Sequence, residues 1–381
     1  MRQRAALLSY FASVAALSVP AVPTERKWGR ASPGEEPPQR AARLLCHKEH
    51  QARQKARRLA RLDALLDRAH ASLGDDWTHC TPAVPCGQYG VDWTMLPPGC
   101  DPCAISVKMA PGTARGERKR ESIDAMAWLL STFSLSTASP TIVDAGCGTG
   151  SLLLPLAALF PNATFVGIDY KKGSLQRLRV RADEAGDDLS RRVVTWHGRI
   201  EDYDGPLDAL LSLHACGGAS DAALTLASER NVPYGVSPCC IGKLRRGPSS
   251  SWLRDLLLTQ SGCGADPLAA EVNAAKSFAL LASWADSEHV GVAAYGPSGG
   301  RKGSPAGHGH DTVAVAATRR YRCKTLVELD RLIALSETQA AGHGEAIRPG
   351  VRPGRLLWIP GEAMATSGQA ELLTCASAHH H

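Results

Sequence analysis

The stretch that decides the fold reads Thr141-Ile142-Val143-Asp144-Ala145-Gly146-Cys147-Gly148-Thr149-Gly150, an apolar segment followed by three closely spaced glycines. This pattern predicts a β-strand over 141–145, a tight turn and a helix over 151–160. Glycine has no Cβ atom, so the turn can adopt positive φ angles and a ligand can press against its backbone. Amide groups at the start of the helix would then face an anionic group of that ligand, such as a carboxylate.

The glycine spacing excludes two common nucleotide-binding motifs. A dinucleotide-binding loop needs its third glycine at position 151, which is Ser151, and a P-loop needs Gly-Lys-Ser/Thr after four spacer residues. The next predicted strand, 164–169, ends in Asp169, whose carboxylate can accept both ribose hydroxyls of an adenosyl group. The alternative is a purely structural turn, with Asp169 capping the following helix.

Strand and helix patterns alternate from residue 117 onward, which favours an α/β fold with a mainly parallel sheet. Further strands are expected at 193–197, 209–214, 234–238, 290–295 and 312–319. Further helices are expected at 118–133, 171–185, 220–230, 250–260 and 267–285. Only a Gly-rich loop, 296–311, separates the last two strands, so we predict that they pair antiparallel. The result is a Rossmann-like sheet of seven strands.

Length and composition indicate a globular chain with appendages. The chain has 381 residues, of which 44% are hydrophobic and 21% charged, which excludes wholesale disorder. Its 12 cysteines are too sparse for a disulfide framework, so we expect reduced thiols inside a cell. We divide the chain into a targeting or disordered segment at 1–38, a basic amphipathic helix at 39–74, a Cys/Pro-rich connector at 75–116, the α/β domain at 117–340 and a Gly/Pro-rich tail at 341–381.

The N-terminal segment resembles a targeting peptide, because Arg2 and Arg4 precede an apolar run and no acidic residue occurs before Glu25. The run is too interrupted for a membrane-spanning helix. A disordered start is the alternative. We expect the protein in the cytoplasm, or in an organelle if residues 1–22 act as a targeting peptide.

The helix at 39–74 has leucines every seven residues in its second half and is basic in its first half. The basic residues are Lys48, Arg53, Lys55, Arg57, Arg58 and Arg61. They form either a solvated face or a surface for RNA or an acidic protein, with 39–61 as the binding stretch. We expect residues 24–73 to contribute to substrate affinity rather than to folding.

Polar side chains follow the third, fourth and fifth strands, where ligands bind in open α/β sheets. After the third strand, Glu201 or Asp202 is a candidate for contact with an adenine amine. The next two strand ends bring together His214, Cys216, Cys239 and Cys240. These residues suit three roles: zinc ligation, core packing, or, for His214, action as a general base or positioning group.

A zinc site is disfavoured at this position, because Cys239 and Cys240 are adjacent and Cys216 stands where a zinc deaminase would carry its glutamate. The connector offers a second candidate zinc site. Its cysteines are Cys80, Cys86, Cys100 and Cys103. Only the last two have the two-residue gap of a true ligand pair, so we assign no metal.

Three motifs resemble the methyltransferase domain of the glutathione S-transferase C-terminal-domain-containing protein family. They are Asp144-Ala-Gly-Cys-Gly-Thr-Gly150, Leu213-His-Ala-Cys-Gly217 with Ser220-Asp221, and Pro238-Cys-Cys240. The similarity extends to Trp93-Thr-Met-Leu-Pro97, Asp101-Pro102, Arg118-Lys-Arg120 and Leu326-Val-Glu-Leu-Asp330-Arg331. It covers residues 91–335. The chain shows no glutathione-transferase-like domain and carries a short basic helix instead.

The resemblance implies a class I methyltransferase fold, S-adenosyl-L-methionine (SAM) as cofactor and transfer of a methyl group. It implies as cofactor residues Asp144, Gly146, Gly148, Gly150 and Asp169, to which we add Cys147, Glu201 and Asp202. His214, Cys216 and Cys239 are the candidate catalytic residues. RNA is the favoured acceptor, because related domains occur in RNA methyltransferases. The alternatives are a non-catalytic SAM-fold module that binds RNA or a protein partner, and a zinc-dependent hydrolase.

Overall fold

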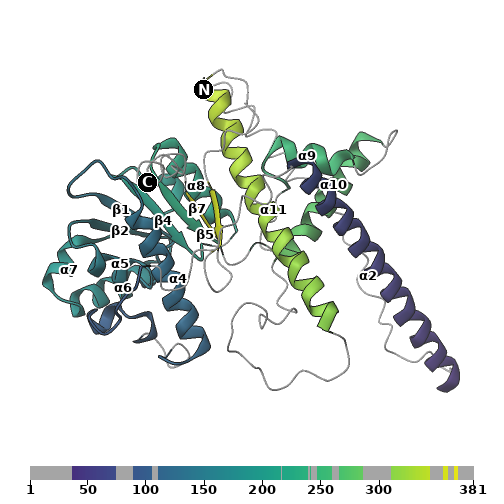
Figure 1. Ribbon diagram of the computed structural model, residues 1–381, viewed down its shortest axis with the longest axis horizontal. Helices are drawn as coiled ribbons and strands as arrows, with labels where there is room; N and C mark the ends of the chain where they lie inside the picture. The colour runs from purple at the N-terminus through teal and green to yellow at the C-terminus, as the bar shows by residue number, and fades with distance from the viewer. Residues whose placement is uncertain are drawn as a thin grey trace, which may run out of the picture. The chain divides into compact units, whose positions relative to one another are not determined.

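The computed structural model describes residues 37–73, 89–104, 110–215, 217–238, 241, 247–259, 266–285, 310–343, 355–358 and 364–367. Contacts between residues divide the chain into two compact units, residues 1–60 and 61–381. The second unit contains the sheet and the helices that surround it (Figure 1).

Five strands of the described chain form one parallel sheet in the order β3-β2-β1-β4-β5. They are β1 (Thr141–Ala145), β2 (Thr164–Asp169), β3 (Val193–His197), β4 (Ala209–Leu213) and β5 (Tyr234–Ser237). Asp144 of the central strand pairs with Gly167 of β2 on one side and with Leu211 of β4 on the other. The chain order reverses between β1 and β4, so the carboxyl ends of these strands form the switch point at which open sheets bind ligands.

Successive side chains of the central strand enter different hydrophobic clusters, because a β-strand alternates its side chains between the two faces. Ile142 packs in one cluster with side chains of the helices α4 (Ala114–Ser131), α5 (Leu153–Leu159) and α6 (Lys172–Glu184). Val143 packs in the other, with side chains of α8 (Gly218–Glu229). The sheet is therefore covered by helices on both faces, which confirms the predicted Rossmann-like α/β fold.

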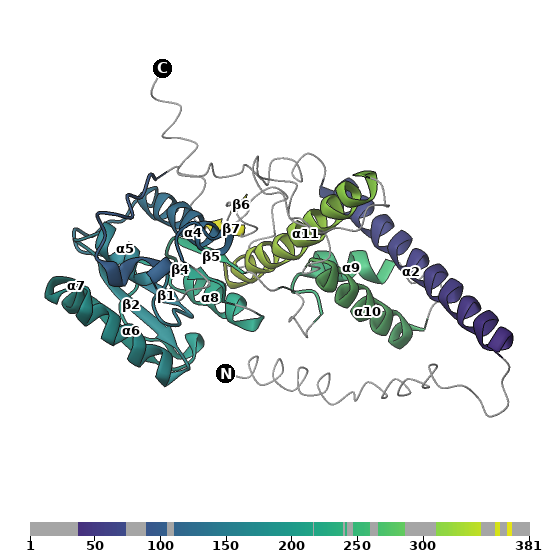
Figure 2. The same cartoon turned by 90° about the horizontal axis from the view of Figure 1, so that it is seen from below.

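Three further helices pack into the same cluster as α8. They are α9 (Ser251–Leu258), α10 (Pro267–Ala285) and α11 (His310–His343), which lie side by side (Figures 1 and 2). The predicted helices at 118–133, 151–160, 171–185, 220–230, 250–260 and 267–285 are confirmed to within a few residues by α4, α5, α6, α8, α9 and α10. A short helix that was not predicted, α7 (Asp187–Arg192), follows α6.

The N-terminal helix α2 (Pro37–Leu73) also enters this core through its last turns. Leu62, Leu65, Leu66 and Ala69 are each at most 1% exposed. The Asp63 carboxylate pairs with both Nε and Nη2 of Arg319 on α11, at 2.6 and 2.7 Å. The expectation that residues 24–73 do not contribute to folding is therefore wrong for 61–73, because the heptad leucines are core residues.

The predicted strand at 312–319 is wrong, since this segment lies inside α11. Its alternating Thr, Val and Ala residues mimic a strand, but the chain continues without a turn signal into good helix formers. The predicted strand at 290–295 lies outside the described residues. The described antiparallel pair is instead β6 (Arg355–Trp358) with β7 (Met364–Ser367), in the segment predicted as a tail, and β7 lies beside β5.

The sheet that carries the candidate site therefore has five described strands instead of the predicted seven. Among the described helices, none combines the length and the apolar character that crossing a membrane requires.

Candidate functional site

The glycine loop after β1 adopts the predicted conformation, with φ angles of 79° at Gly146, 57° at Gly148 and 81° at Gly150. The loop is tied to the end of β2, because the amides of Gly146 and Cys147 both donate to Ile168 O, at 2.9 and 3.0 Å. A Cβ atom at Gly150 would collide with Leu178, whereas one at Gly148 would meet no atom within 4 Å. Gly150 therefore serves close packing, and Gly148 leaves open space beside the backbone.

Asp169 at the end of β2 is bonded to this loop. Its Oδ2 accepts a hydrogen bond from Gly148 N at 3.0 Å, and its Oδ1 accepts one from Lys171 N at 2.8 Å. A carboxylate oxygen has two lone pairs, so each oxygen keeps capacity for a further donor. The half-buried carboxylate is thus oriented toward the loop and can still bind hydroxyl groups of a ligand.

Asp144 is a buried carboxyl group at the end of the central strand, with only 3% exposure. Its Oδ2 has no hydrogen-bond partner among the residues that the structure describes. Burial raises the pKa of Asp144 to about 7, while the positive charge of Lys119 lowers it and the negative charge of Asp169 raises it. A buried polar atom without a partner is costly, so this oxygen fits a ligand that brings a hydrogen-bond donor or a positive charge.

Cys147 is 7% exposed and packs in the hydrophobic cluster behind the loop. Its Sγ lies 3.7 Å from Gly148 O, and a Cβ atom at Gly167 would approach this sulfur to 2.8 Å. Burial raises the pKa of its thiol, with further contributions from the negative charges of Asp144 and Asp169. Contact between Cys147 and a ligand in the loop would therefore involve its backbone.

Glu201 and Asp202 lie in a short 3-10 turn, η4 (Ile200–Asp202), after β3. Glu201 Oε1 accepts a hydrogen bond from Arg199 Nη2 at 2.9 Å, and this bond lowers the pKa of Glu201. Both partners are largely exposed. Ile200 is buried and holds the turn against the sheet.

Tyr170 was not among the predicted site residues. It directly follows Asp169, its side chain is 68% exposed, and Lys171 Nζ lies 5.3 Å from the centre of its ring. An exposed aromatic face beside Asp169 suits a flat ring such as adenine. The sequence signal that identifies it is a large aromatic residue directly after the acid that ends the second strand.

His214 follows β4 in a left-handed conformation, with a φ of 69°, which is uncommon for a residue other than glycine. Its amide donates to Ser237 O at the end of β5, at 2.9 Å. The side chain reaches solvent, yet desolvation by neighbouring atoms and the positive charges of Lys119, Lys324 and Arg115 lower its pKa to about 3. The imidazole is therefore neutral at physiological pH and retains a nitrogen lone pair.

Cys216, Cys239, Cys240, Cys80 and Cys86 lie outside the described residues. Cys100 and Cys103 are buried free thiols, and burial raises the pKa of Cys100 to about 11. In the part of the chain that the structure describes, no three potential metal ligands among His, Cys, Asp and Glu gather at one point.

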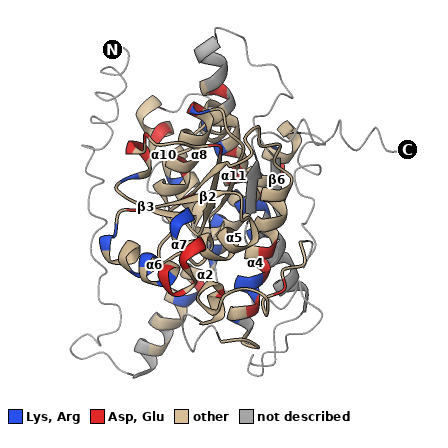
Figure 3. Cartoon of the chain, turned by 90° about the vertical axis from the view of Figure 1, so that its left-hand side faces the viewer, with Lys and Arg blue, Asp and Glu red and all other residues tan. Residues whose placement is uncertain are grey.

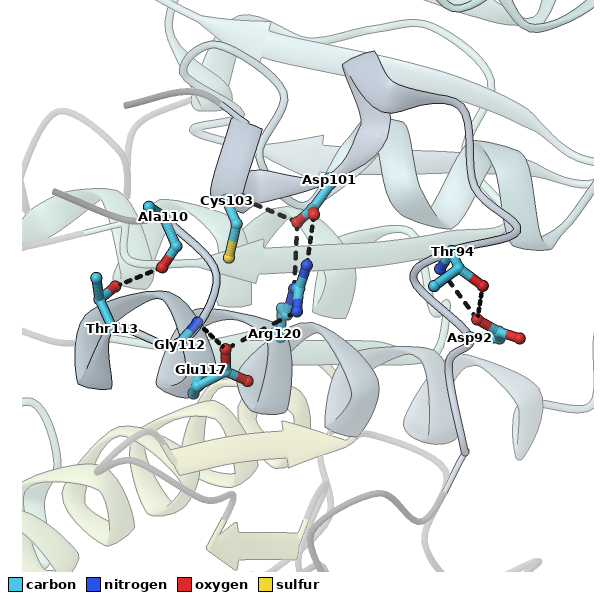
Figure 4. A network of polar contacts seen from close by, with 9 residues as sticks. All are labelled: Asp92, Thr94, Asp101, Cys103, Ala110, Gly112, Thr113, Glu117 and Arg120. Atoms are coloured by element: carbon cyan, nitrogen blue, oxygen red, sulfur yellow. Dashed lines mark hydrogen bonds and ion pairs between the residues drawn. The ribbon is translucent and has the colours of Figure 1, made fainter. Parts of the chain in front are cut away.

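The start of α4 is fixed by a polar network that explains the motif residues upstream (Figure 4). Asp101 pairs with Arg120, with 2.6 Å between Oδ2 and Nη2, and Glu117 Oε1 accepts from Gly112 N at 2.8 Å. The Arg120 guanidinium also lies 5.4 Å from the Trp93 ring centre. Both acidic and basic residues occur in this part of α4 (Figure 3). The network thereby orients the helix that carries Lys119.

The stretch that contains this site is similar to a known protein family. Residues 118–247 match a protein family described as a methyltransferase domain. The matched stretch begins in α4 and extends beyond β5, so it includes the glycine loop, Asp169 and His214.

Curated relatives are similar to the chain over part of its length. The glutathione S-transferase C-terminal domain-containing protein homolog of Drosophila melanogaster is 31% identical over 166 residues, which is 44% of this chain and 27% of the relative. The Homo sapiens protein named for the same domain is 28% identical over 159 residues, 42% of this chain and 24% of the relative. The predicted resemblance is confirmed. The chain spans about a quarter of the length of these relatives.

Solved structures that are similar to part of the chain include methyltransferases. The glycopeptide N-methyltransferase MtfA in complex with SAM is 16% identical, with a TM-score of 0.25, over 30% of this chain and 54% of that chain. A putative rRNA-methylase from Clostridium thermocellum is 21% identical, with a TM-score of 0.25, over 31% of this chain and 66% of that chain.

Proposed function

We propose that the protein transfers a methyl group from SAM to a nucleophile on RNA. The observation that carries this proposal is the buried, unpartnered Oδ2 of Asp144 beside a glycine loop that leaves open space at Gly148. A carboxylate in this position fits the cationic amino group of SAM, and the methyltransferase domain match favours the same cofactor. When bound, SAM supplies an activated, electrophilic methyl group.

Different residues of the chain would bind different parts of such a cofactor. Asp144 would accept hydrogen bonds from its amino group, and Asp169 would accept those of its ribose hydroxyls. The Gly148 backbone leaves room between them. Tyr170 and the turn with Glu201 and Asp202 lie at the ends of β2 and β3, where they would enclose an adenine ring.

His214 is the residue best placed to act on the acceptor. A positioned base is most effective when its pKa lies near the working pH, and the pKa of His214 is far lower, at about 3. We therefore assign it a positioning role, in which the neutral ring accepts a hydrogen bond from the nucleophile and aligns it with the methyl group. Alignment of this kind supplies much of the catalysis when the transferred group is already activated.

RNA as acceptor is supported by the first half of α2. Residues 44–60 contain five lysines and arginines, all exposed, and Glu49 is the only acid among them. The basic residues are Lys48, Arg53, Lys55, Arg57 and Arg58. Such a charge density binds polyanions by releasing their counterions. A protein partner with an acidic surface is the rival acceptor.

The test is methyl transfer from isotope-labelled SAM to separate pools of RNA, protein and small metabolites from cells. We expect label in RNA, and we expect less label when Arg53, Lys55, Arg57 and Arg58 are replaced by Gln. Label confined to protein or metabolites would exclude RNA. SAM binding without transfer to any pool would favour a non-catalytic module.

A further inference from the structure

Helix α11 contributes a series of buried charged side chains beside the helices that follow β4 and β5. Lys324, Glu328, Asp330 and Arg331 are each at most 3% exposed. Burying a charge is expensive unless a partner compensates for it, so the partners of these groups show what the helix holds in place.

Arg331 connects α11 to the segment that carries His214. Its Nη1 lies 2.7 Å from Glu328 Oε1, and its Nε lies 3.0 Å from Asp221 Oδ1. Asp221 belongs to the first turn of α8, and in the same turn the hydroxyl of Ser220 donates to Ala215 O. A chain of polar contacts therefore runs from α11 through α8 to the residue after His214.

Asp330, the neighbour of Arg331, binds the start of α9. Its carboxylate accepts hydrogen bonds from Ser249 N at 2.7 Å, from Ser250 N at 2.8 Å and from Ser250 Oγ at 2.6 Å. Ser250 is the N-cap of α9, where its side chain also accepts from Leu253 N. The end of the segment that joins β5 to α9 is thus fixed to the same turn of α11.

The buried cation Arg331 interacts with three acids, Asp221, Glu328 and Asp330. The positive charge of Lys324 acts on both Glu328 and His214. Compared with apolar residues of similar size, buried ion pairs stabilise a fold little. What this cluster supplies is a defined geometry between α11 and α8.

We infer that Arg331 and Asp330 are positioning residues, which hold the start of α8 and the start of α9 in the arrangement that the methyl acceptor requires. Arg331 acts on His214 through Asp221 and Ser220, and Asp330 acts through the start of α9. The inference rests on the proposed function, since it takes these segments as the acceptor side of the site.

The test uses the full chain with the double substitution Asp221→Asn and Arg331→Met. This change removes one charge of each sign, so the net charge of the cluster stays the same. The matched control is Asp63→Asn with Arg319→Met, which breaks another ion pair of α11, the one with α2. For each protein we would measure thermal unfolding, SAM affinity, kcat and KM on total cellular RNA, and the NMR titration of His214.

We expect kcat of the Asp221/Arg331 variant to fall about 10- to 100-fold, the cost of a small misplacement, with SAM affinity unchanged within about threefold. The control should keep kcat within about twofold of wild type. The His214 titration should shift in the first variant only, because the distance between the ring and Lys324 changes. Equal kcat and equal His214 titration in the variant and the control would overturn the inference.

Two further results distinguish a failure of this inference from a failure of the proposed function or of folding. If wild type binds SAM but transfers no methyl group to RNA, the proposed acceptor is wrong, and the His214 titration alone decides the positioning role. If the double variant does not fold, Ser220→Ala removes the contact with Ala215 O without changing any charge. This variant should shift the His214 titration and lower kcat, and a wild-type titration would contradict the inference.

Discussion

Gly148 N donates a hydrogen bond to Asp169 Oδ2 at 3.0 Å, so the acid that ends β2 is fixed to the glycine loop that follows β1. The two parts of the candidate cofactor site are 21 residues apart in sequence and are joined by this contact. Pairing of β1 with β2 in parallel register brings them together. This contact therefore fixes the two parts of the candidate site relative to each other.

This relationship predicts that Gly148→Ala lowers SAM affinity without unfolding the protein. The new methyl group would occupy the open space beside the loop, and a φ of 57° adds strain of about 1 kcal/mol. Gly112→Ala is the control, since Gly112 also has a positive φ and open surroundings but lies outside the loop. Calorimetry should show weaker SAM binding for Gly148→Ala only. Equal affinities in the two variants would place the ligand elsewhere.

SAM affinity is predicted to rise with pH near neutrality, because Asp144 ionises there. With a pKa of about 7 in the free protein, Asp144 is mostly protonated at pH 6 and mostly ionised at pH 8. Only the ionised form attracts a cationic amino group, so affinity should increase about tenfold over this interval. In Asp144→Asn the pH dependence should disappear and affinity should stay low. A wild-type affinity that does not change with pH would refute the assignment of Asp144.

His214→Ala is predicted to lower kcat by about 10²-fold, the cost of a misplaced acceptor, with SAM affinity changed only a few fold. His214→Gln should retain more activity, because its amide oxygen can still accept a hydrogen bond. Since desolvation by neighbouring atoms and the positive charges of Lys119, Lys324 and Arg115 lower the pKa of His214 to about 3, kcat of wild type should show no ionisation of this residue between pH 5 and 8. A His214-dependent step near pH 6.5 would show that the residue is a base with an ordinary pKa.

Leu66→Ala in α2 is predicted to destabilise the protein by about 2 to 5 kcal/mol, the usual cost of a cavity at a fully buried leucine. Leu45→Ala in the same helix is the control, because Leu45 is 59% exposed and should contribute little. Chemical denaturation of the two variants provides the comparison. Equal stabilities would mean that residues 61–73 do not belong to the core.

Sequence patterns were sufficient for the five strands of the sheet, because each is a short apolar run that ends in a turn signal. The same rule failed at 312–319, where the alternation of Thr, Val and Ala occurs within a longer helix. The glycine loop and Asp169 were identifiable because their chemistry requires specific residue types at a fixed spacing. Placement of β6 and β7 was missed because both strands are only four residues long and lie among Gly and Pro residues.

The other features that the sequence did not predict depend on contacts between residues far apart in the chain. The charged residues Asp330 and Arg331 look like an ordinary solvated pair in the sequence, yet both are buried and hold segments that precede them by about 80 and 110 residues. The role of Asp144 likewise depends on the absence of a partner for its Oδ2, which follows from packing around β1. Neither property has a periodicity that a sequence pattern can reveal.

Cofactor binding at the glycine loop and Asp169 is tested most directly by a calorimetric titration of SAM into the full chain and into Asp169→Ala. We expect saturable binding of one SAM per chain to wild type. In the variant we expect a loss of about 1 to 3 kcal/mol, because the ribose hydroxyls lose their acceptor. No binding of SAM to the wild-type protein, or equal binding by both proteins, would show that SAM does not bind at this site.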